Sequence, residues 1–398
     1  MKRLTSIILS LLLLFAPLNA DANETAEIYP YDAVISDYWF APASAEYKSD
    51  GSAKALLLME FSTGRVLFAE NERERLPIAS VTKVVTALLV AEAIDSGKIS
   101  LGETVTVSEY AASMGGSQVF LEAGEQMSVD DLLKSVMVAS ANDATVALAE
   151  HICGSEAAFV SRMNERAREL GCADSSFANT NGLPAENHYS CALDVAIITR
   201  ELMKHSLIFN YTTIWMDTIR NGSFGLANTN KLIRFYKGAT GMKTGYTGEA
   251  KYCLSGTAER DGMKLIAVVL GGESSDKRFA AAKGLLDCGF ANYTLVTPSL
   301  PHIEPMKVER GVSESVALKA EPISILCEKG DKAETEIKLE LRESLQAPID
   351  ANTEVGAVLY YRNGELVGQS AIYTAEAVVG VSYSSLLKKL FFALLSRK

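Results

Sequence analysis

The sequence predicts an α+β protein with two folded parts, followed by an amphipathic C-terminal helix. Three observations predict it. Helical and strand-like stretches alternate up to about residue 290, short β-type runs dominate after about residue 305, and residues 381–398 carry apolar side chains at helical spacing. Prolines at 298, 301 and 305 interrupt the pattern between the two parts. The hydrophobic fraction of 48% is enough for ordinary cores.

The N-terminal residues have the composition of an export signal. Lys2 and Arg3 precede an apolar run from Leu4 to Leu18 that contains no acidic residue, and small residues stand at 20 and 22. This pattern predicts a secretory signal peptide over residues 1–22, cut after Ala22. The alternative is an uncleaved membrane anchor, but the run is short for a span. No cysteine stands at the cleavage site, which argues against a lipoprotein anchor.

The C-terminal residues 381–398 predict a helix that lies on a membrane surface. The apolar stripe consists of Tyr383, Leu386, Leu387, Leu390, Phe391, Leu394 and Leu395. The basic residues that fall largely outside it are Lys388, Lys389, Arg397 and Lys398. Such a helix suits an anionic bilayer and is too short to span one; the alternative is a helix packed on the protein's own core. The chain as a whole carries a net charge of −11, which argues against nucleic acid as a partner.

The second folded part is predicted to be a small β-rich domain from about 305 to 378. Its β-type runs cover residues 315–318, 336–341, 356–361 and 370–373. Turn residues separate these runs, and Arg362-Asn363-Gly364 contains a hairpin signal.

Cysteine and histidine usage gives no sign of a metal or cofactor site. The six cysteines are Cys153, Cys172, Cys191, Cys253, Cys288 and Cys327. An even count in an exported chain permits disulfides, but the spacing is not that of a small disulfide scaffold, so we expect mostly free, buried thiols. His188 and Cys191 could suggest metal ligation, but the four histidines provide no second pair of this kind, which argues against a metal site. Their number leaves a Ser-His-Asp triad open, although no Gly-x-Ser-x-Gly elbow occurs.

The first of three chemical motifs is Ser80-Val-Thr-Lys83, which opens a helical run over residues 81–94. Residues three apart share a helix face, so Lys83 is expected beside the Ser80 hydroxyl. A lysine amine can take a proton from serine only when it is neutral, and both burial and a second cation lower its pKa. Lys243 is the candidate second cation. The backbone N–H of Ser80 could also stabilise an oxyanion. The alternative is a helix-capping serine with a solvated lysine.

The second motif is Ser140-Ala-Asn142, which follows an apolar helical stretch over residues 132–138. A short polar turn between two helices can project a hydroxyl and an amide into a cleft. Ser140 is then a candidate proton relay, and Asn142 is a candidate for hydrogen bonding to substrate. The alternative is an ordinary helix–helix turn.

The third motif, Lys243-Thr244-Gly245, precedes two strand-like runs over residues 253–258 and 265–270. These runs predict neighbouring antiparallel strands, and an edge strand beside them could present Lys243 and Thr244 to a carboxylate. Gly245 would let substrate approach the backbone closely. The alternative is a strand end with a turn glycine.

Each motif is short enough to occur by chance, but the three in this order and at this spacing are typical of serine acyl-transfer enzymes that bind penicillin. Around the motifs, four segments resemble the low-molecular-mass penicillin-binding proteins, the serine-type D-alanyl-D-alanine carboxypeptidases of the SxxK acyltransferases. The segments are residues 76–88, 140–144, 181–190 and 241–247. The resemblance covers about residues 30–290 as a catalytic domain, and the β-rich domain and basic tail match the same family's layout.

The resemblance implies a penicillin-binding/β-lactamase-like antiparallel sheet flanked by helices. It implies removal of the terminal D-alanine from peptidoglycan stem pentapeptides ending in D-Ala-D-Ala, with β-lactams as covalent inhibitors and no cofactor. It also implies a location outside the bacterial cytoplasmic membrane, on the periplasmic or cell-wall side. Carried over to this sequence, the catalytic residues are Ser80, Lys83 and Ser140. The substrate-binding residues are Asn142, Lys243, Thr244, Gly245, Tyr246 and Arg278, with the N–H groups of Ser80 and Tyr246 as oxyanion hole.

Two departures from the family pattern stand out: Lys251 replaces a common glycine, and Cys191 replaces a usual threonine. Both bear on local packing and the substrate rim. Three alternatives use the same motifs. A class A β-lactamase needs a deacylation glutamate, but no Glu-x-x-Leu-Asn run lies between Ser140 and Lys243. A D,D-endopeptidase or transpeptidase would differ in the acceptor, and a non-catalytic wall-binding protein would have a decayed site.

Overall fold

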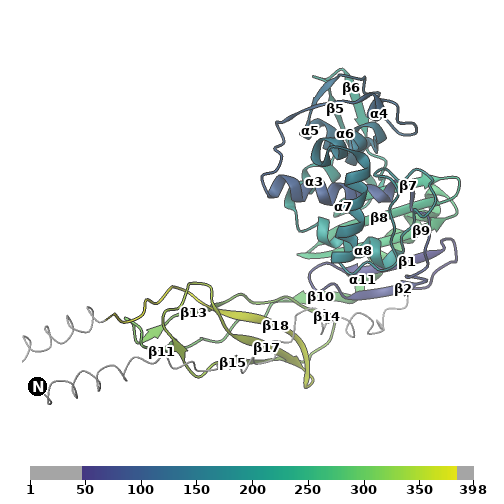
Figure 1. Ribbon diagram of the computed structural model, residues 1–398. Helices are drawn as coiled ribbons and strands as arrows, with labels where there is room; N and C mark the ends of the chain where they lie inside the picture. The colour runs from purple at the N-terminus through teal and green to yellow at the C-terminus, as the bar shows by residue number, and fades with distance from the viewer. Residues whose placement is uncertain (1–46, 383–398) are drawn as a thin grey trace, which may run out of the picture. The chain divides into compact units, whose positions relative to one another are not determined.

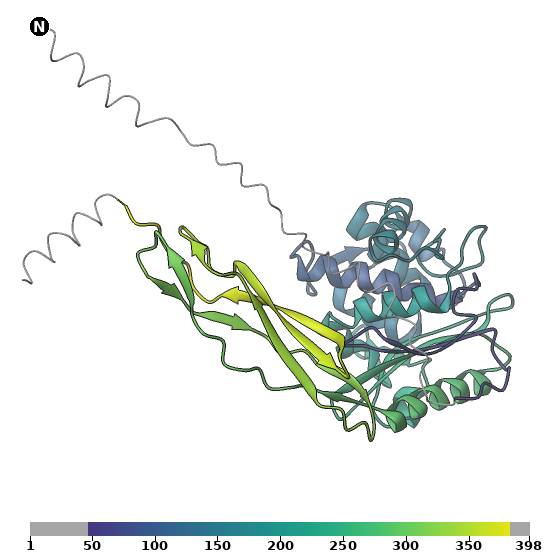
Figure 2. The ribbon, with the colours of Figure 1, turned by 90° about the horizontal axis from the view of Figure 1, so that it is seen from below.

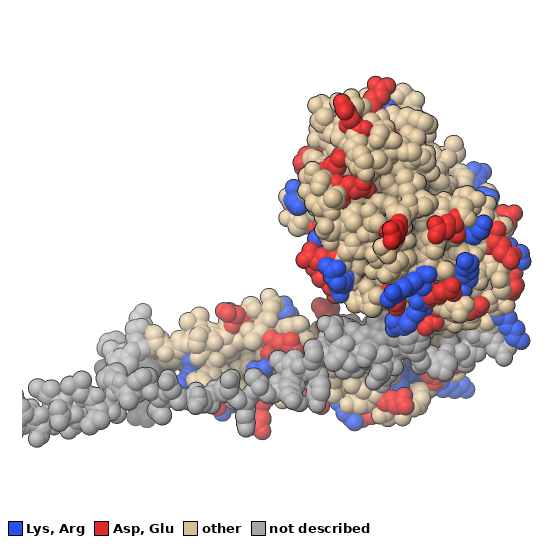
Figure 3. Space-filling view, turned by 45° about the vertical axis from the view of Figure 1, so that its right-hand side comes forward, with Lys and Arg blue, Asp and Glu red and all other residues tan. Residues whose placement is uncertain are grey.

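The computed structural model describes residues 47–382 (Figure 1). The predicted signal peptide and all but the first two residues of the predicted C-terminal helix lie outside these residues. No helix among residues 47–382 is long and apolar enough to cross a membrane. On the face shown in Figure 3, acidic and basic side chains are interspersed. That face therefore offers no extended basic surface of the kind that attracts nucleic acid.

A five-stranded antiparallel sheet forms the centre of the catalytic part, in the order β2-β1-β9-β8-β7. The strands are β1 (Ala55–Glu60), β2 (Val66–Glu70), β7 (Ala239–Thr247), β8 (Lys251–Arg260) and β9 (Met263–Gly272). Ala258 pairs with Leu265 and Leu254 with Val269, so the antiparallel neighbours predicted from the sequence are confirmed. Strand β7, which carries the Lys243-Thr244-Gly245 motif, lies at the edge of the sheet, as expected.

Helices cover both faces of this sheet. On one face, α11 (Ser275–Asn292) buries Leu285 and Leu286 against Leu58 and Leu265. On the other, α8 (Ala192–Leu202) approaches closely enough for a 2.7 Å hydrogen bond between the Thr199 and Ser255 hydroxyls. Figure 2 shows α11 (green) on one side of the strands and earlier helices (purple to teal) on the other. The expected sheet flanked by helices is confirmed.

A helical cluster continues from the second face. Its central helix, α3 (Lys83–Asp95), is buried along nearly its whole length, which is why its sequence is apolar all round. The other helices are α4 (Glu109–Ala112), α5 (Val129–Lys134), α6 (Asn142–Cys153), α7 (Glu156–Glu169), α9 (Phe209–Thr212) and α10 (Leu232–Phe235). Short 3₁₀ turns η2 (Ala79–Thr82) and η4 (Ser206–Ile208), the π-helical turn η3 (Ser135–Ala139) and two hairpins complete the cluster. The hairpins pair β3 (Thr104–Thr106) with β4 (Gln126–Ser128) and β5 (Met216–Ile219) with β6 (Phe224–Ala227).

The part after α11 is all β, as the sequence predicts. Its strands are β10 (Tyr293–Val296), β11 (Met306–Glu309), β12 (Ser315–Val316), β13 (Leu318–Ala320), β14 (Ile325–Glu328), β15 (Thr335–Leu341), β16 (Leu345–Gln346), β17 (Glu354–Arg362) and β18 (Glu365–Thr374). The first predicted run is divided between two strands, because β12 and β13 join different sheets. Asn363 and Gly364 both have positive φ angles, 53° and 82°, so they form the expected two-residue hairpin between β17 and β18.

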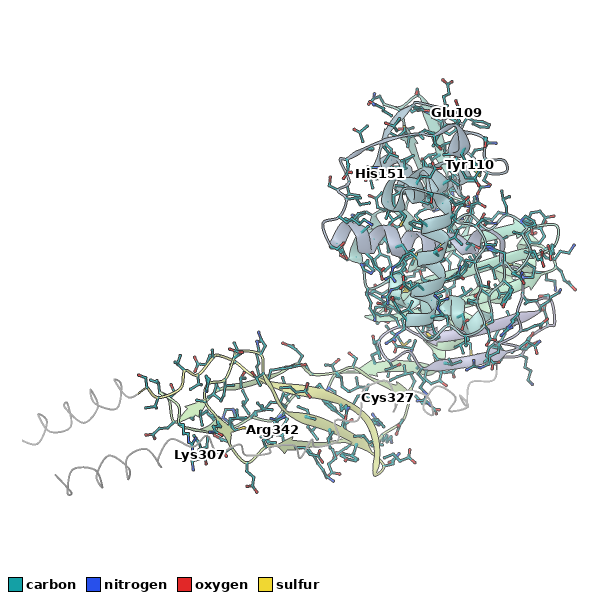
Figure 4. The ribbon with its side chains drawn as sticks, in the orientation of Figure 1. Glu109, Tyr110, His151, Lys307, Cys327 and Arg342 are labelled. Carbon is teal, nitrogen blue, oxygen red and sulfur yellow. The ribbon has the colours of Figure 1, made fainter. Side chains whose placement is uncertain are left out.

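The six cysteines all lie among the described residues, and all are free thiols. Cys172, Cys191, Cys253 and Cys327 are buried, and Cys327 is labelled in Figure 4. Burial raises the pKa of each of these four thiols, which keeps them protonated and unreactive. Within residues 47–382, no three His, Cys, Asp or Glu side chains are grouped so that they could hold a metal ion.

Candidate active site

Ser80 lies in a 3₁₀ turn, and the predicted helical run from residue 81 begins as an α-helix only at Lys83. The reason is a left-handed backbone at Ala79, with φ at 48°, followed by a hydrogen bond of 3.2 Å from Val81 N–H to the Ile78 carbonyl. Lys83 nevertheless lies beside the Ser80 hydroxyl, as the three-residue spacing predicts. The Lys83 side-chain nitrogen lies 3.0 Å from the Ser80 hydroxyl oxygen.

Lys83 is completely buried, and three oxygens surround its Nζ. Besides Ser80 Oγ, these are the Asn142 side-chain carbonyl at 2.6 Å and the Asn181 backbone carbonyl at 2.8 Å. Burial holds the pKa of Lys83 well below its ordinary value, and the Lys243 cation lowers it further. The lowered pKa that the sequence predicts for Lys83 is therefore confirmed. A neutral amine here can donate to the two carbonyls and accept the proton of the Ser80 hydroxyl.

Ser140 ends the π-helical turn η3 in a left-handed conformation, with φ at 64° and ψ at 29°. The next helix, α6, begins two residues later at Asn142. The predicted polar turn between two helices is confirmed, and its backbone is in a region that non-glycine residues rarely occupy. The turn aims Ser140 Oγ at Lys243 Nζ, 2.9 Å away, while Asn142 reaches Lys83.

Lys243 is also buried, and its Nζ donates to Ser140 Oγ and, at 3.1 Å, to the Thr244 carbonyl. Burial lowers the pKa of Lys243 to about 7, and the nearby Arg278 cation contributes to the decrease. A carboxylate that binds beside Lys243 would favour the charged form and raise this pKa again. The Thr244 hydroxyl lies 2.7 Å from that of Thr229.

Gly245 has a close backbone neighbour that the sequence did not predict. A side-chain Cβ at this position would lie 2.6 Å from the Ile78 carbonyl oxygen and 3.0 Å from the backbone nitrogens of Ser80 and Val81. The structure shows a close approach of the serine's own turn, and the close approach of substrate stays a prediction. Without a side chain at 245, strand β7 and the Ser80 turn lie in backbone contact.

Two further predicted residues lie beside the third motif, Tyr246 on β7 and Arg278 on α11. Tyr246 is 56% exposed, and its ring packs against that of Tyr252 at a tilt of 37°, with centroids 4.5 Å apart. Arg278 is buried and donates from Nη1 to the carbonyls of Gly245 and Cys253, at 3.1 and 3.0 Å. Arg278 thus ties β7 and β8 together beside the motif, and its Nε has no hydrogen-bond partner among the described residues.

Several residues of the site were not predicted. The buried Asp143 carboxylate accepts hydrogen bonds from the backbone N–H groups of Val119 and Leu121, at 3.1 and 3.0 Å. Asn142 binds the same loop, because its side-chain amide donates to the Gly115 carbonyl at 2.6 Å. The position of Asp143 directly after the second motif was an available signal. Asn181 begins the resembling segment 181–190, but its role rests on a backbone oxygen, which has no sequence signature, and Thr229 belongs to no motif.

Among residues 47–382, no Ser-His-Asp triad forms around Ser80. His188 is buried, and its ring nitrogens lie 2.8 Å from Thr82 Oγ1 and 3.1 Å from the Ala178 backbone nitrogen. Burial lowers the pKa of His188 to about 4, so the ring is neutral near pH 7. Lys83 is the basic group that contacts the Ser80 hydroxyl.

The comparison with known proteins agrees with this geometry. Residues 42–274 match the family model of D-alanyl-D-alanine carboxypeptidases, and residues 302–379 match that of the C-terminal domain of penicillin-binding protein 5. The D-alanyl-D-alanine carboxypeptidase DacF of Bacillus subtilis (strain 168) is 42% identical over 365 residues, which are 88% of this chain and 94% of the relative.

Solved structures are similar as well. Penicillin-binding protein 5 from Haemophilus influenzae superposes with a TM-score of 0.71 at 32% identity, covering 84% of this chain and 99% of that one. A mutant of the Streptomyces K15 DD-transpeptidase has a TM-score of 0.57 at 29% identity and covers 61% of this chain and all of that one.

The fold and the lysine-paired serine define a penicillin-binding acyl-transfer enzyme of the serine type. Within that class, the chain belongs to the D-alanyl-D-alanine carboxypeptidase family and is a low-molecular-mass penicillin-binding protein. The expected peptidase activity on D-Ala-D-Ala ends is confirmed, and the β-lactamase, transpeptidase and non-catalytic alternatives are not favoured.

Proposed function

We propose that Ser80 is the acylated nucleophile with which this carboxypeptidase removes the terminal D-alanine of peptidoglycan stem pentapeptides. The observation that carries the proposal is the 3.0 Å contact between Ser80 Oγ and the Nζ of a fully buried lysine whose pKa is strongly lowered. A neutral Lys83 takes the hydroxyl proton while Ser80 Oγ attacks the carbonyl between the two D-alanines.

The tetrahedral oxyanion is stabilised by the backbone N–H groups of Ser80 and Tyr246. Support comes from the close packing of the two segments, since a Cβ on Gly245 would lie only 3.0 Å from Ser80 N. Donors fixed by a packed backbone need no reorganisation when charge develops, and one such donor typically contributes about 10²- to 10³-fold to the rate.

The leaving amine needs a proton, and Ser140 is placed to relay one. Its hydroxyl accepts a hydrogen bond of 2.9 Å from Lys243, whose pKa of about 7 permits proton exchange near neutral pH. The peptide C–N bond breaks, the protonated D-alanine amine leaves, and the acyl group remains on Ser80. The proton that Lys83 took from Ser80 passes to the Ser140–Lys243 pair and replaces the one given to the amine, so Lys83 is neutral again. Water then attacks the ester carbonyl, Lys83 accepts the water proton, and Ser80 Oγ regains its hydrogen.

The terminal carboxylate of the substrate is bound by Lys243 and Thr244, and Asn142 hydrogen-bonds the peptide. Arg278 contributes a buried positive charge next to the same strand and orients it through the Gly245 carbonyl. A β-lactam carries a carboxylate near its reactive amide, so the same groups would place it for attack by Ser80.

The test is labelling with a fluorescent penicillin together with D-alanine release from diacetyl-L-Lys-D-Ala-D-Ala. Ser80→Ala is expected to lose both signals. A matched control is Ser274→Ala, because Ser274 and Lys277 form a second Ser-x-x-Lys pattern at the start of α11, where Lys277 pairs with Asp50 at 2.8 Å. Equal labelling of Ser80→Ala and wild type would refute the assignment.

We also propose that the protein is exported and acts on the outer side of the cytoplasmic membrane, with residues 381–398 lying on the membrane surface. The support is the sequence pattern at both ends, together with a family whose substrate belongs to the cell wall. Removal of residues 381–398 is expected to shift the protein from the membrane fraction to the soluble one. An unchanged membrane share would refute the role of this segment.

A further inference from the structure

Lys251 has an unusual backbone conformation at the tip of the hairpin that carries the third motif. Strand β7 ends at Thr247, which pairs with Lys251, the first residue of β8. The Thr247 hydroxyl accepts a 3.0 Å hydrogen bond from Ala250 N–H, which closes the three-residue loop between them. Lys251, the residue that follows this loop and begins β8, has a left-handed backbone, with φ at 57°.

Glycine is the residue that this position ordinarily favours, because it has no Cβ to clash in the left-handed region. A lysine held there costs about 1 kcal/mol or more of conformational energy. Nothing in the surrounding contacts offsets that cost, because Lys251 is exposed and forms no ion pair or side-chain hydrogen bond within residues 47–382. Residues with this backbone include Ala79 and Ser140 of the active site as well as loop residues such as Arg310, so the position of Lys251 decides what its conformation means.

The position of Lys251 is close to the reacting groups. Thr247 is two residues beyond Gly245, the residue whose backbone contacts the Ser80 turn. Strand rise and strand spacing together place the Lys251 Cα about 8 Å from that of Gly245. The flexible four-carbon stem of lysine lets the ammonium group cover the surface between them.

The surroundings of Lys251 combine positive charge with aromatic surface. Tyr246 lies 56% exposed between Gly245 and the hairpin tip, packed against Tyr252. The Arg278 guanidinium carbon lies 5.5 Å from the centre of the Tyr252 ring. Glu249, in the loop itself, forms no ion pair with Lys251. The exposed surface formed by Lys251 and Tyr246 suits a ligand segment that carries a carboxylate on an apolar chain.

We propose that Lys251 is a specificity-determining residue that binds a carboxylate of the stem peptide upstream of the terminal D-Ala-D-Ala. The inference rests on the proposed function, because the terminal carboxylate is assigned there to Lys243 and Thr244. A cation at the tip of the same β7–β8 hairpin then meets a second acidic group of the substrate. The pairing is exposed, so its contribution is modest and falls with salt.

Two substrates that differ in one carboxylate test this directly: Nα-acetyl-Nε-acetyl-L-Lys-D-Ala-D-Ala and its Nε-succinyl counterpart. The wild type is expected to prefer the succinyl substrate about three- to fivefold in kcat/KM at low salt. Lys251→Asn removes the charge but tolerates a left-handed backbone, and Lys251→Gly removes both charge and strain. Both variants are expected to lose the preference, and Lys251→Arg is expected to keep it.

Lys98→Asn is the matched control, since Lys98 is an exposed lysine just beyond the far end of α3 and its replacement changes the net charge equally. It should keep the wild-type preference. An identical preference in Lys251→Asn and wild type, or no preference in wild type, would overturn the inference while leaving the carboxypeptidase mechanism intact. Failure of the wild type to release D-alanine from either substrate would instead overturn the proposed function, and the inference with it.

Discussion

Gly245→Ala is expected to slow acylation of Ser80 by about 100-fold. The added Cβ would lie 2.6 Å from the Ile78 carbonyl oxygen, whereas ordinary contacts begin near 3.4 Å. The difference requires β7 and the Ser80 turn to separate by about 0.8 Å, and both are backbone segments that cannot rotate away. A misplacement of about 1 Å at a reacting group typically costs about 100-fold in rate.

The assay is the second-order rate constant for acylation by a fluorescent penicillin, measured together with thermal unfolding. Gly248→Ala is the control, because Gly248 lies in the loop of the same hairpin and a Cβ there would meet no atom within 4 Å. It should react at the wild-type rate. A folded Gly245→Ala protein that also reacts at that rate would refute the argument that the backbone contact positions Ser80.

Three other predictions follow from the charges of Lys83 and Lys243 and from the N-terminal cap of α8. Because the pKa of Lys83 is lowered and its neutral form is the base, the acylation rate should rise with pH through that pKa. Lys243→Gln should move this limb to higher pH, and Asp143→Asn to lower pH, in stopped-flow acylation across a pH series. Lys243 titrates near 7 when folded but near 10.5 when unfolded, so the unfolded chain binds more protons in this range and the unfolding free energy gains a positive slope with pH. Urea unfolding at pH 7.5 and 9.5 should show that the unfolding free energy of Lys243→Met increases less with pH than that of the wild type. Cys191 caps α8 through a 3.4 Å contact from Asp194 N–H to its sulfur, so Cys191→Thr should raise the unfolding free energy by about 0.5–1 kcal/mol in the same assay. The first argument would be contradicted by a pH profile of acylation that does not move or moves the other way. The second would be contradicted by an unchanged pH dependence of stability in Lys243→Met, and the third by an unfolding free energy that does not rise in Cys191→Thr.

The sequence predicted best where the relevant contacts are local. The neighbourhood of Ser80 and Lys83 follows from a three-residue spacing, and it survives even though the turn proves to be 3₁₀ and the α-helix begins only at Lys83. The hairpin at Asn363-Gly364 is equally local, since two residues with positive φ fix the turn type. The edge position of β7 required only the recognition of two following strands as its neighbours in the sheet.

Tertiary structure decided the electrostatics and the identity of close neighbours. The partners of Lys83 at Asn142 and Asn181 lie 59 and 98 residues away, and Lys243 meets Ser140 across 103 residues. Burial and proximity of this kind set the pKa of both lysines, and no spacing along the chain encodes them. The sequence by itself therefore determined which groups are present and the class of reaction. Only packing of the sheet edge against the helical cluster decided that the pKa of Lys83 is strongly lowered beside the serine, and that Gly245 lies in contact with the backbone of the Ser80 turn.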